Sequence, residues 1–450
     1  MSNATTAATT TTTGTRRPKI AIIGAGGVVF PLRLMGDFLS FPALQGADFS
    51  LMDIDLERAR HTAAEAQELV DAHGFPASVA ATSDQREALA GADYVVVTFM
   101  VGGVDIYRYD MEIPRAYGVD QRIGDTLGPG GVFRFLRNVP ALTAIARDMH
   151  ELCPHALLIN YANPMAMNCW YLEALGITTV GLCHSVQGTS RMLAEQIGAD
   201  YDRVTFKVGG INHQAWFTEF HDGPTDLLPA IQAHMTAKYV DQETRDRGVW
   251  GGERVRTEIM NAFGYFHTES SPHASEYLPY FRKNEALIDH YEPTRWNYEE
   301  VKASNSARQR DRTLVESLLG ELKPSLEYGA WIVNAMETGT PTVIYGNVPN
   351  TGLIDNLPAD ACVEVACLVD RNGIQPTHFG ALPPQCAAVN QTNINVQRLA
   401  VQAALAGKRE HVYHAVMLDP LTAAVCTLGQ IRSMVDELFA ANEGWLPPLA

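Results

Sequence analysis

Apolar residues in the first part of the chain fall in short, nearly unbroken runs rather than in alternating patterns. Five such runs cover residues 19–23, 49–54, 94–100, 156–161 and 178–183, and helical patterns such as 56–73 and 139–151 lie between them. Strands with apolar side chains in succession are typically buried on both faces, as in a parallel sheet covered by helices. The alternation therefore predicts an α/β fold with a Rossmann-like, doubly wound parallel sheet.

The second part of the chain has a different pattern. Helical patterns over residues 305–319, 395–406 and 431–441 are mixed with a few strand-like runs, such as 342–345 and 363–368. A chain of 450 residues is too long for one simple core. We therefore expect a doubly wound domain over residues 18–190 and a C-terminal mixed α+β domain over residues 191–450. No internal repeat and no long linker separates them, so they should share a large interface.

Composition narrows the possible partners. The chain is 46% hydrophobic and 19% charged, with a formal net charge of −17. Such an acidic protein is not expected to bind nucleic acid or an anionic membrane surface. Its seven cysteines form no CxxC motif, which fits a reducing cytoplasm better than a disulfide framework.

Residues 1–17 are rich in threonine, and we expect them to form a disordered tail. They lack the apolar core of roughly 7–15 residues that marks a signal peptide. Later apolar runs are regularly broken by polar residues, so no membrane span is expected. The protein is therefore predicted to work in the cytoplasm.

A glycine-rich turn follows the first predicted strand. Gly24, Gly26 and Gly27 would let the backbone approach a pyrophosphate, although Val29 occupies the third glycine position of the GxGxxG pattern. The second strand ends at Asp53, which is placed to accept hydrogen bonds from both ribose hydroxyls and disfavours a 2′-phosphate. An ordinary turn with a capping aspartate is the alternative. The pattern favours NAD over NADP.

Two further segments have an unusual local sequence. Residues 124–131, GDTLGPGG, are so rich in Gly and Pro that we expect an irregular loop with a specific backbone shape. The fourth strand leads into Asn163-Pro164, at the carboxyl edge where open α/β sheets bind ligands. The Asn163 amide would suit sugar hydroxyls, but an asparagine is also common in turns.

Cys183 and His213 are the residues most typical of a metal site. Cys183 closes the fifth apolar run, and His213 follows Gly209–Asn212. A thiolate and an imidazole can hold a divalent ion that keeps open positions for substrate. A buried structural cysteine and a satisfied core histidine are the alternative for either residue alone. A metal site and a dinucleotide site in one chain would limit the number of reactions that the protein could catalyse.

The order of these segments resembles glycoside hydrolase family 4, the NAD- and manganese-dependent glycosidases related in fold to lactate and malate dehydrogenases. The resemblance runs from about residue 18 to the C-terminus and is strongest toward the bacterial α-galactosidase branch. The segments that carry it are GAGGVVF (24–30), LMDID (51–55), GDTLGPGG (124–131), NYANPMAMN (160–168), GLCHSVQGT (181–189), GGINH (209–213), GYFHTESS (264–271), VIYGNV (343–348), GLIDNLP (352–358), CVEVACLVD (362–370) and QTNINVQ (391–397).

The resemblance implies glycoside cleavage without net redox change. In that route the sugar is oxidised at C3 with NAD, loses a proton at C2 and its leaving group at C1, adds water, and is reduced again. The resemblance further implies that Cys183 and His213 bind Mn²⁺, that Asn163 binds substrate, and that the NAD site contains Gly24, Gly26, Gly27 and Asp53. It also implies a small α-galactoside as substrate and a homodimer or homotetramer.

The acid and the base are less well determined. In some branches of the family, an aspartate directly after the metal-binding cysteine acts as the acid, and this chain has His184 at that position. A tyrosine is the C2 base in another branch, for which Tyr277 is the matching candidate, with a packing role as the alternative. A further branch uses an aspartate near the position of Glu269. The candidate catalytic residues are therefore Tyr277, His184 and Glu269.

Other functions fit the same sequence features. An α-glucosidase or α-glucuronidase of the same family would carry the same motifs, and an NAD-dependent sugar dehydrogenase would share the first domain but accumulate NADH. A catalytically silent sugar sensor is a further alternative. A thiolate ligand ordinarily favours zinc or a softer ion, so manganese is expected from the resemblance alone.

Overall fold

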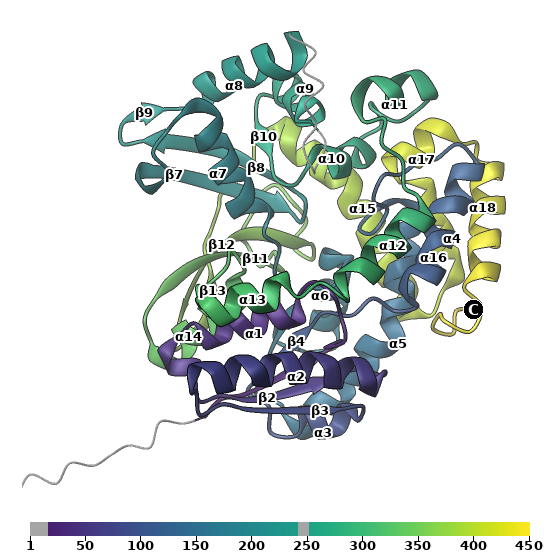
Figure 1. Ribbon diagram of the computed structural model, residues 1–450. Coiled ribbons are helices and arrows are strands. Elements are labelled where there is room, and N and C mark those ends of the chain that lie inside the picture. Colours follow the sequence, from purple (N-terminus) through teal and green to yellow (C-terminus); the bar gives the residue numbers. More distant parts are fainter. Residues whose placement is uncertain (1–16, 242–251) are drawn as a thin grey trace, which may run out of the picture.

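One mixed sheet passes through the molecule in the computed structural model, which describes residues 17–241 and 252–450 (Figure 1). Its first part is parallel and has the strand order β3-β2-β1-β4-β5-β6. That is the strand order of a dinucleotide-binding fold. The strands are β1 (Lys19–Ile23), β2 (Asp48–Met52), β3 (Ser78–Thr82), β4 (Tyr94–Val97), β5 (Leu157–Asn160) and β6 (Thr179–Gly181).

The structure confirms the five predicted strands of this part. Their apolar runs are buried on both faces of the sheet, as expected for parallel strands covered by helices. The sequence prediction missed β3, an edge strand in which exposed and half-buried residues alternate. Helices cover both faces and are α1 (Pro31–Leu39), α2 (Leu56–His73), α3 (Gln85–Leu89), α4 (Gly103–Ala116), α5 (Gly128–Leu152), α6 (Met165–Ala174) and α7 (Ser185–Ile197). The boundary expected near residue 190 falls inside α7.

The prediction that residues 124–131 are irregular throughout was wrong, because α5 begins at Gly128. Proline is tolerated in a first helical turn, where its missing N–H has no intrahelical partner to lose. The glycines serve close packing: a Cβ on Gly130 would lie 2.7 Å from the Asp110 carbonyl oxygen, and one on Gly131 would lie 2.6 Å from the Thr126 carbonyl carbon. Of the eight residues 124–131, only residues 124–127 lie outside the helix.

The sheet continues beyond β6 with antiparallel neighbours in the order β6-β11-β12-β7-β8-β10. The joins β6–β11 and β12–β7 each consist of one residue pair, Asn347 with Gly181 and Glu364 with Gly210. The strands are β7 (Val204–Ile211), β8 (Gln214–Asp222), β9 (Thr225–Asp226), β10 (Phe266–His267), β11 (Thr342–Pro349), β12 (Cys362–Asp370) and β13 (Gly373–Pro376). The two halves of the chain thus share one sheet.

Helices surround this second part, as the sequence predicted. They are α8 (Leu228–Thr236), α9 (Arg254–Phe263), α10 (Ser271–Tyr277), α11 (Glu285–Tyr291), α12 (Tyr298–Arg308), α13 (Thr313–Gly320), α14 (Tyr328–Thr338), α15 (Pro384–Ala406), α16 (Arg409–Met417), α17 (Pro420–Val425) and α18 (Leu428–Ala441). The single helix predicted over residues 305–319 was wrong: α12 ends at Arg308, and α13 begins at Thr313 after Asp311, whose side chain accepts from the Thr313 amide. A side chain that bonds the backbone two residues ahead competes with helix continuation.

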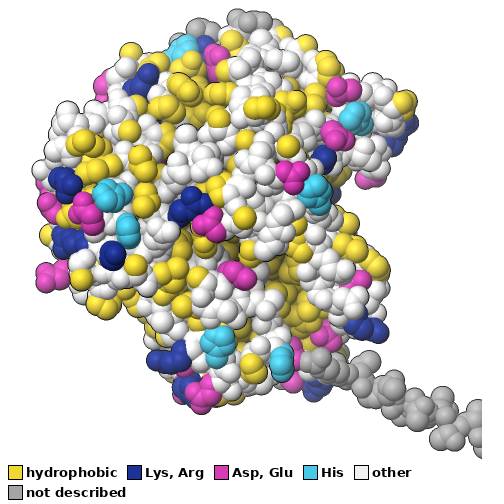
Figure 2. All heavy atoms as spheres, turned by 180° about the vertical axis from the view of Figure 1, so that it is seen from behind, with side chains coloured by type: hydrophobic (Ala, Val, Ile, Leu, Met, Phe, Trp, Pro, Cys, Tyr) yellow, Lys and Arg dark blue, Asp and Glu magenta, His cyan; other side chains and the backbone are white. Residues whose placement is uncertain are grey.

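The predicted tail lies outside the described residues except for Arg17. That side chain donates to the carbonyl oxygens of Gly46 and Pro76, so Arg17 belongs to the folded domain. Acidic and basic side chains are interspersed on the face seen in Figure 2, and neither sign forms a continuous patch there. Within the two described ranges, no helix is long and apolar enough to cross a membrane.

Candidate active site

The glycine turn after β1 lies against the carboxyl end of β2. Gly24 has φ +94°, and a Cβ on it would lie 2.7 Å from the Phe99 amide nitrogen. A Cβ on Gly26 would lie 2.8 Å from Asp53 Oδ2, the atom to which the Gly26 amide donates at 2.9 Å. Only glycine fits at these two positions. The turn therefore keeps its backbone bare and places the Asp53 carboxylate at the edge of the sheet.

The rest of the turn explains why this chain lacks the third glycine. The helix begins only at Pro31, so residues 24–30 form a longer connection than the GxGxxG pattern implies. Val29 is 47% exposed, so no close packing of helix on strand requires a glycine there. A Cβ on Gly27 would lie 3.3 Å from the Gly24 carbonyl oxygen, a much looser fit than at Gly26. A bare backbone beside a carboxylate suits a dinucleotide with a free 2′-hydroxyl.

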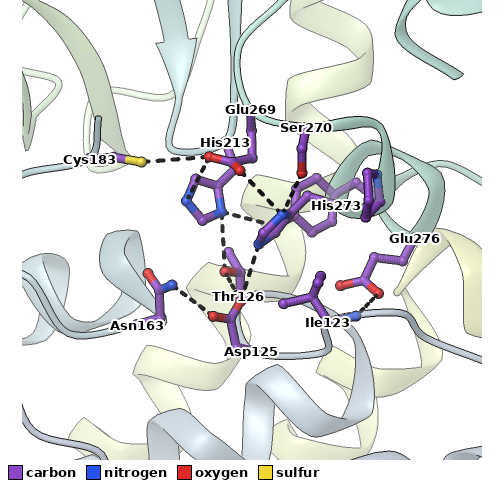
Figure 3. Close-up of polar contacts among 12 residues, drawn as sticks. Ile123, Asp125, Thr126, Asn163, Cys183, His213, Glu269, Ser270, His273 and Glu276 are labelled. Carbon is purple, nitrogen blue, oxygen red and sulfur yellow. Dashed lines mark hydrogen bonds and ion pairs between the residues drawn. The ribbon is translucent and has the colours of Figure 1, made fainter. Parts of the chain in front are cut away.

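Three potential metal ligands meet beyond β6, β7 and β10. The ligand atoms of Cys183, His213 and Glu269 all lie within 4.8 Å of one another. Oε2 of Glu269 is 3.7 Å from Cys183 Sγ and 3.6 Å from His213 Nε2 (Figure 3). A sulfur, a nitrogen and an oxygen donor fit a divalent ion that keeps positions open for substrate oxygens. The structure brings Glu269 into the cluster that the sequence assigned to Cys183 and His213.

The backbone at this cluster is strained. His213 has φ +63° and Glu269 has φ +69°, and they are the two non-glycine residues with positive φ among the residues that the structure describes. Such a conformation costs about 1–3 kcal/mol and persists only where the surroundings impose it, typically at functional sites. Both strained residues are candidate ligands, so the strain marks the cluster as functional.

Burial controls the protonation of the cluster. It raises the pKa of the Cys183 thiol well above its usual range, and the nearby Glu269 and Glu364 carboxyls raise it further. Burial also lowers the pKa of His213 to about 4. At neutral pH and without a cation, Cys183 is therefore a thiol and His213 is neutral. A cation that binds here must displace the Cys183 proton.

A chain of charged and polar groups runs from the cluster to Asn163. His273 Nδ1 lies 3.3 Å from Glu269 Oε1, and His273 Nε2 lies 3.7 Å from Asp125 Oδ1. Burial alone would lower the pKa of His273, but the Glu269 and Asp125 carboxylates raise it to about 9. Burial would raise the pKa of Glu269, but His273 and His213 bring it down to about 2. Asp125 Oδ2 accepts from Asn163 Nδ2 at 2.9 Å, which fixes the orientation of that amide (Figure 3).

Tyr277 lies behind His213. Its hydroxyl is 3.0 Å from His213 Nδ1, and Thr126 Oγ1 is 3.3 Å from the same nitrogen. The Tyr277 side chain is fully buried, and burial raises its pKa well above the usual range. Contacts of this kind on the outer ring nitrogen orient a metal-binding histidine.

His184 lies beside the cluster but outside it. Its Nδ1 is 3.3 Å from Glu327 Oε1, and its side chain is 52% exposed. The hydrogen bond with Glu327 raises the pKa of His184. Its exposure places this imidazole where a group that enters from solvent can reach it.

Sequence reasoning missed several side chains of the site. Asp125 and Thr126 stood in the quoted GDT segment without an assigned role, and His273 went unnoticed although it lies four residues after Glu269. Asn347 and Glu364 occupy the two single-pair joins of the sheet and approach one another at 3.5 Å. Burial raises the pKa of Glu364 to about 8. A polar residue within an otherwise apolar strand was the one signal for these two.

Comparison with known proteins agrees with this arrangement. The family profile of family 4 glycosyl hydrolases matches residues 19–199, and the profile of the family 4 glycosyl hydrolase C-terminal domain matches residues 208–422. The chain therefore belongs to glycoside hydrolase family 4. The family predicted from the sequence is confirmed.

Two relatives cover nearly the whole chain. An α-galactosidase from Bacillus subtilis (strain 168) is 42% identical in an alignment of length 438 that covers 95% of this chain and 99% of the relative. An α-galactosidase from Rhizobium meliloti (strain 1021) is 37% identical in an alignment of length 451 that covers 96% of this chain and 90% of the relative.

Solved structures confirm the predicted fold. A putative glucosidase from Bacillus subtilis is similar with a TM-score of 0.83 at 28% identity, over 94% of this chain and 99% of that one. A 6-phospho-α-glucosidase from gut microorganisms, solved in complex with NAD and Mn²⁺, has a TM-score of 0.80 at 22% identity, over 97% of this chain and 100% of that one. A malate dehydrogenase from Cryptosporidium parvum has a TM-score of 0.51 at 16% identity, over 87% of this chain and 100% of that one.

Proposed function

We propose that this protein is an NAD- and Mn²⁺-dependent α-galactosidase. The convergence of Cys183, His213 and Glu269 carries the proposal, because it forms a cation site in a fold that also has a bare glycine turn at Asp53. The carboxyl ends of β1, β2, β5 and β6 share one edge of the parallel sheet, so both features lie at the edge where open α/β sheets bind ligands. Two α-galactosidases, 42% and 37% identical over nearly the full length, support the choice of sugar.

Residues of this chain divide the work. NAD would supply a reversible hydride acceptor and Mn²⁺ a Lewis acid beside it. The turn at Gly24 and Gly26 and the Asp53 carboxylate would hold the dinucleotide. Cys183, His213 and Glu269 would hold the cation. The Asn163 amide would bind sugar hydroxyls in the orientation that Asp125 imposes.

The three candidate catalytic residues receive different roles. Glu269 shares the cation site, as its distances to Cys183 and His213 indicate. Tyr277 positions His213, because its buried hydroxyl contacts the outer ring nitrogen. His184 is the proposed acid for the leaving group, since its half-exposed imidazole lies next to Cys183 and pairs with Glu327.

The test is hydrolysis of 4-nitrophenyl α-galactoside with NAD, Mn²⁺ and a reductant, with each component omitted in turn. We expect turnover only in the complete mixture and no net NADH. The corresponding α-glucoside and α-galacturonide are the comparison substrates, and faster cleavage of either would move the assignment within the family. Steady accumulation of NADH would instead indicate a dehydrogenase.

A second measurement tests the route of cleavage. Reaction in D₂O should place deuterium at C2 of the released sugar, because the proposed route breaks that C–H bond. Direct displacement with two carboxylates leaves the bond intact. A product without deuterium at C2 would rule out the oxidation and elimination route even if galactoside were cleaved.

A further inference from the structure

Glu276 binds three successive backbone amides of a loop that lies far from it in the sequence. Its Oε2 accepts from the amides of Arg122 at 2.6 Å and Ile123 at 2.9 Å, and its Oε1 accepts from the amide of Gly124 at 2.8 Å. Figure 3 shows the contact with Ile123. The side chain is fully buried on α10. Consecutive amides that converge on one anion form a backbone nest, here filled by a carboxylate of the same chain.

The loop is shaped for this contact. Gly124 has φ +62°, the left-handed conformation that turns its amide toward the same side as its neighbours. A Cβ on Gly124 would lie 2.3 Å from Met111 Sδ, so a larger residue would have to displace the Met111 side chain. The cations nearby pair with other carboxylates: Arg282 and Arg295 pair with Asp120 at the start of the loop, and His273 pairs with Glu269 and Asp125. Glu276 is thus held by amides rather than by an ion pair.

The two elements that Glu276 joins supply two opposing parts of the candidate active site. The loop carries Asp125 and Thr126, and α10 carries His273 and Tyr277. These residues meet again in the site, where Asp125 faces His273 at 3.7 Å and Thr126 and Tyr277 both contact His213. Within the described part of the chain, the Glu276 side chain makes no hydrogen bond to Cys183, His213 or Glu269.

We propose that Glu276 is a positioning residue, which fixes the 122–126 loop on α10 so that Asp125 and Thr126 reach the sugar-binding amide and the metal-binding histidine in working geometry. The role in turnover rests on the function proposed above. A small displacement of such groups is costly, since about 1 Å of misplacement can lower the rate about 100-fold.

Glu276→Gln tests this role with little change in size. The new NH₂ group cannot accept a hydrogen bond, so at least one of the three loop amides loses its acceptor and faces a donor. We expect kcat for 4-nitrophenyl α-galactoside to fall about 10- to 100-fold, with the Kd for NAD unchanged. Glu276→Ala removes all three acceptors and should lower kcat further.

Asn350→Asp is the matched control. Asn350 is also a buried side chain that holds a loop, with its amide donating to the carbonyl oxygens of Ile354, Leu357 and Pro358. The exchange removes those donors and should lower Tm as much as Glu276→Gln but leave kcat within twofold. Equal loss of kcat in the two variants, or unchanged kcat in Glu276→Gln, would overturn the proposal.

Hydrogen exchange tests the clamp without substrate or activity. In the unmodified protein the amides of Arg122, Ile123 and Gly124 should exchange slowly, and in Glu276→Gln they should exchange at least about 10-fold faster while the β1 amides stay protected. Rapid exchange of the three amides in the unmodified protein would overturn the clamp itself. If the clamp holds but no galactoside is cleaved, the proposed function fails and the positioning contact stands.

Discussion

The nucleotide end and the metal end of the candidate active site are built in opposite ways. The nucleotide end comes from one stretch, residues 24–53, in which missing side chains at Gly24 and Gly26 matter as much as the one carboxylate. The metal end combines residues that follow β6, β7 and β10 with residues from α10 and two loops, and it is crowded with buried charge. The nucleotide end depends on the absence of side chains at two glycines. The metal end depends on contacts between segments that are distant in the sequence. If the two ends are independent, a substitution at one end should change the affinity for one ligand and leave the affinity for the other unchanged.

The largest effect is expected for Cys183→Ser. Loss of the thiolate should lower Mn²⁺-dependent turnover at least about 100-fold, whereas NAD affinity should stay within about twofold because Cys183 lies outside the 24–53 segment. Calorimetry with each ligand separately on the folded variant measures both. Cys153→Ser, a buried cysteine at the end of α5, is the control and should leave both affinities unchanged. A matching loss of NAD affinity in Cys183→Ser would show that the two ends are not independent.

Asp53→Ala should give the reverse pattern. Removing a carboxylate that accepts charge-assisted hydrogen bonds should weaken NAD about 10- to 100-fold and leave Mn²⁺ affinity unchanged. Asp55→Ala is the neighbouring control, because Asp55 only caps α2 and should cost about 1 kcal/mol of stability without affecting NAD. Weaker manganese binding together with intact NAD binding in Asp53→Ala would remove the cofactor assignment.

Metal binding should depend on pH, and NAD binding should not follow the same slope. The pKa of Cys183 is raised and that of His213 is lowered to about 4, so between pH 6 and 8 the cation must displace the thiol proton, whereas His213 has none to lose. Affinity for Mn²⁺ should therefore rise with pH, by up to about tenfold per unit. Calorimetry in two buffers with different protonation enthalpies counts the released proton. An affinity that does not change over this range would contradict Cys183 as a ligand.

Tyr277→Phe should have the smallest effect of the four. Loss of the hydroxyl at His213 Nδ1 should weaken Mn²⁺ about 10-fold, and saturating Mn²⁺ should restore most of the turnover and the deuterium incorporation at C2. The comparison with Thr126→Val, which removes the other hydroxyl at the same nitrogen, shows how the two share the work. Unchanged Mn²⁺ affinity with loss of C2 exchange would identify Tyr277 as the base instead.

The contrast between the two ends also explains what the sequence could predict. The buried parallel strands could be predicted because burial on both faces requires unbroken apolar runs. The edge strand β3 is partly exposed and has no such run. The turn at Gly24 and Gly26 could be predicted because the glycine pattern and the strand before it are close together in the sequence. Asp125 and His273 could not be paired from the sequence, since 148 residues separate them and only the meeting of a loop with α10 makes them neighbours.

Helix ends were predicted less well than helices. The glycines at 130 and 131 indicate a loop in the sequence, yet they serve close packing inside the first turn of α5. Similarly, the pattern over residues 305–319 continues across a break that Asp311 introduces locally. In both cases the helix end is set by a local contact, and the periodic pattern of apolar residues does not reveal such a contact.

The single sheet that joins both halves sets a limit on how this catalyst can adapt. Its single-pair joins at Asn347 and Glu364 connect the strands that precede Cys183 and His213, and parallel strands continue from there to the glycine turn. Enzymes that close two lobes around a substrate can tune the gap between their sites by a hinge, but a shared sheet offers no such degree of freedom. The spacing between the dinucleotide turn and the candidate metal ligands is therefore set by the sheet and not by a hinge between two lobes. We expect new sugars to be accommodated by exchanges of side chains around that gap.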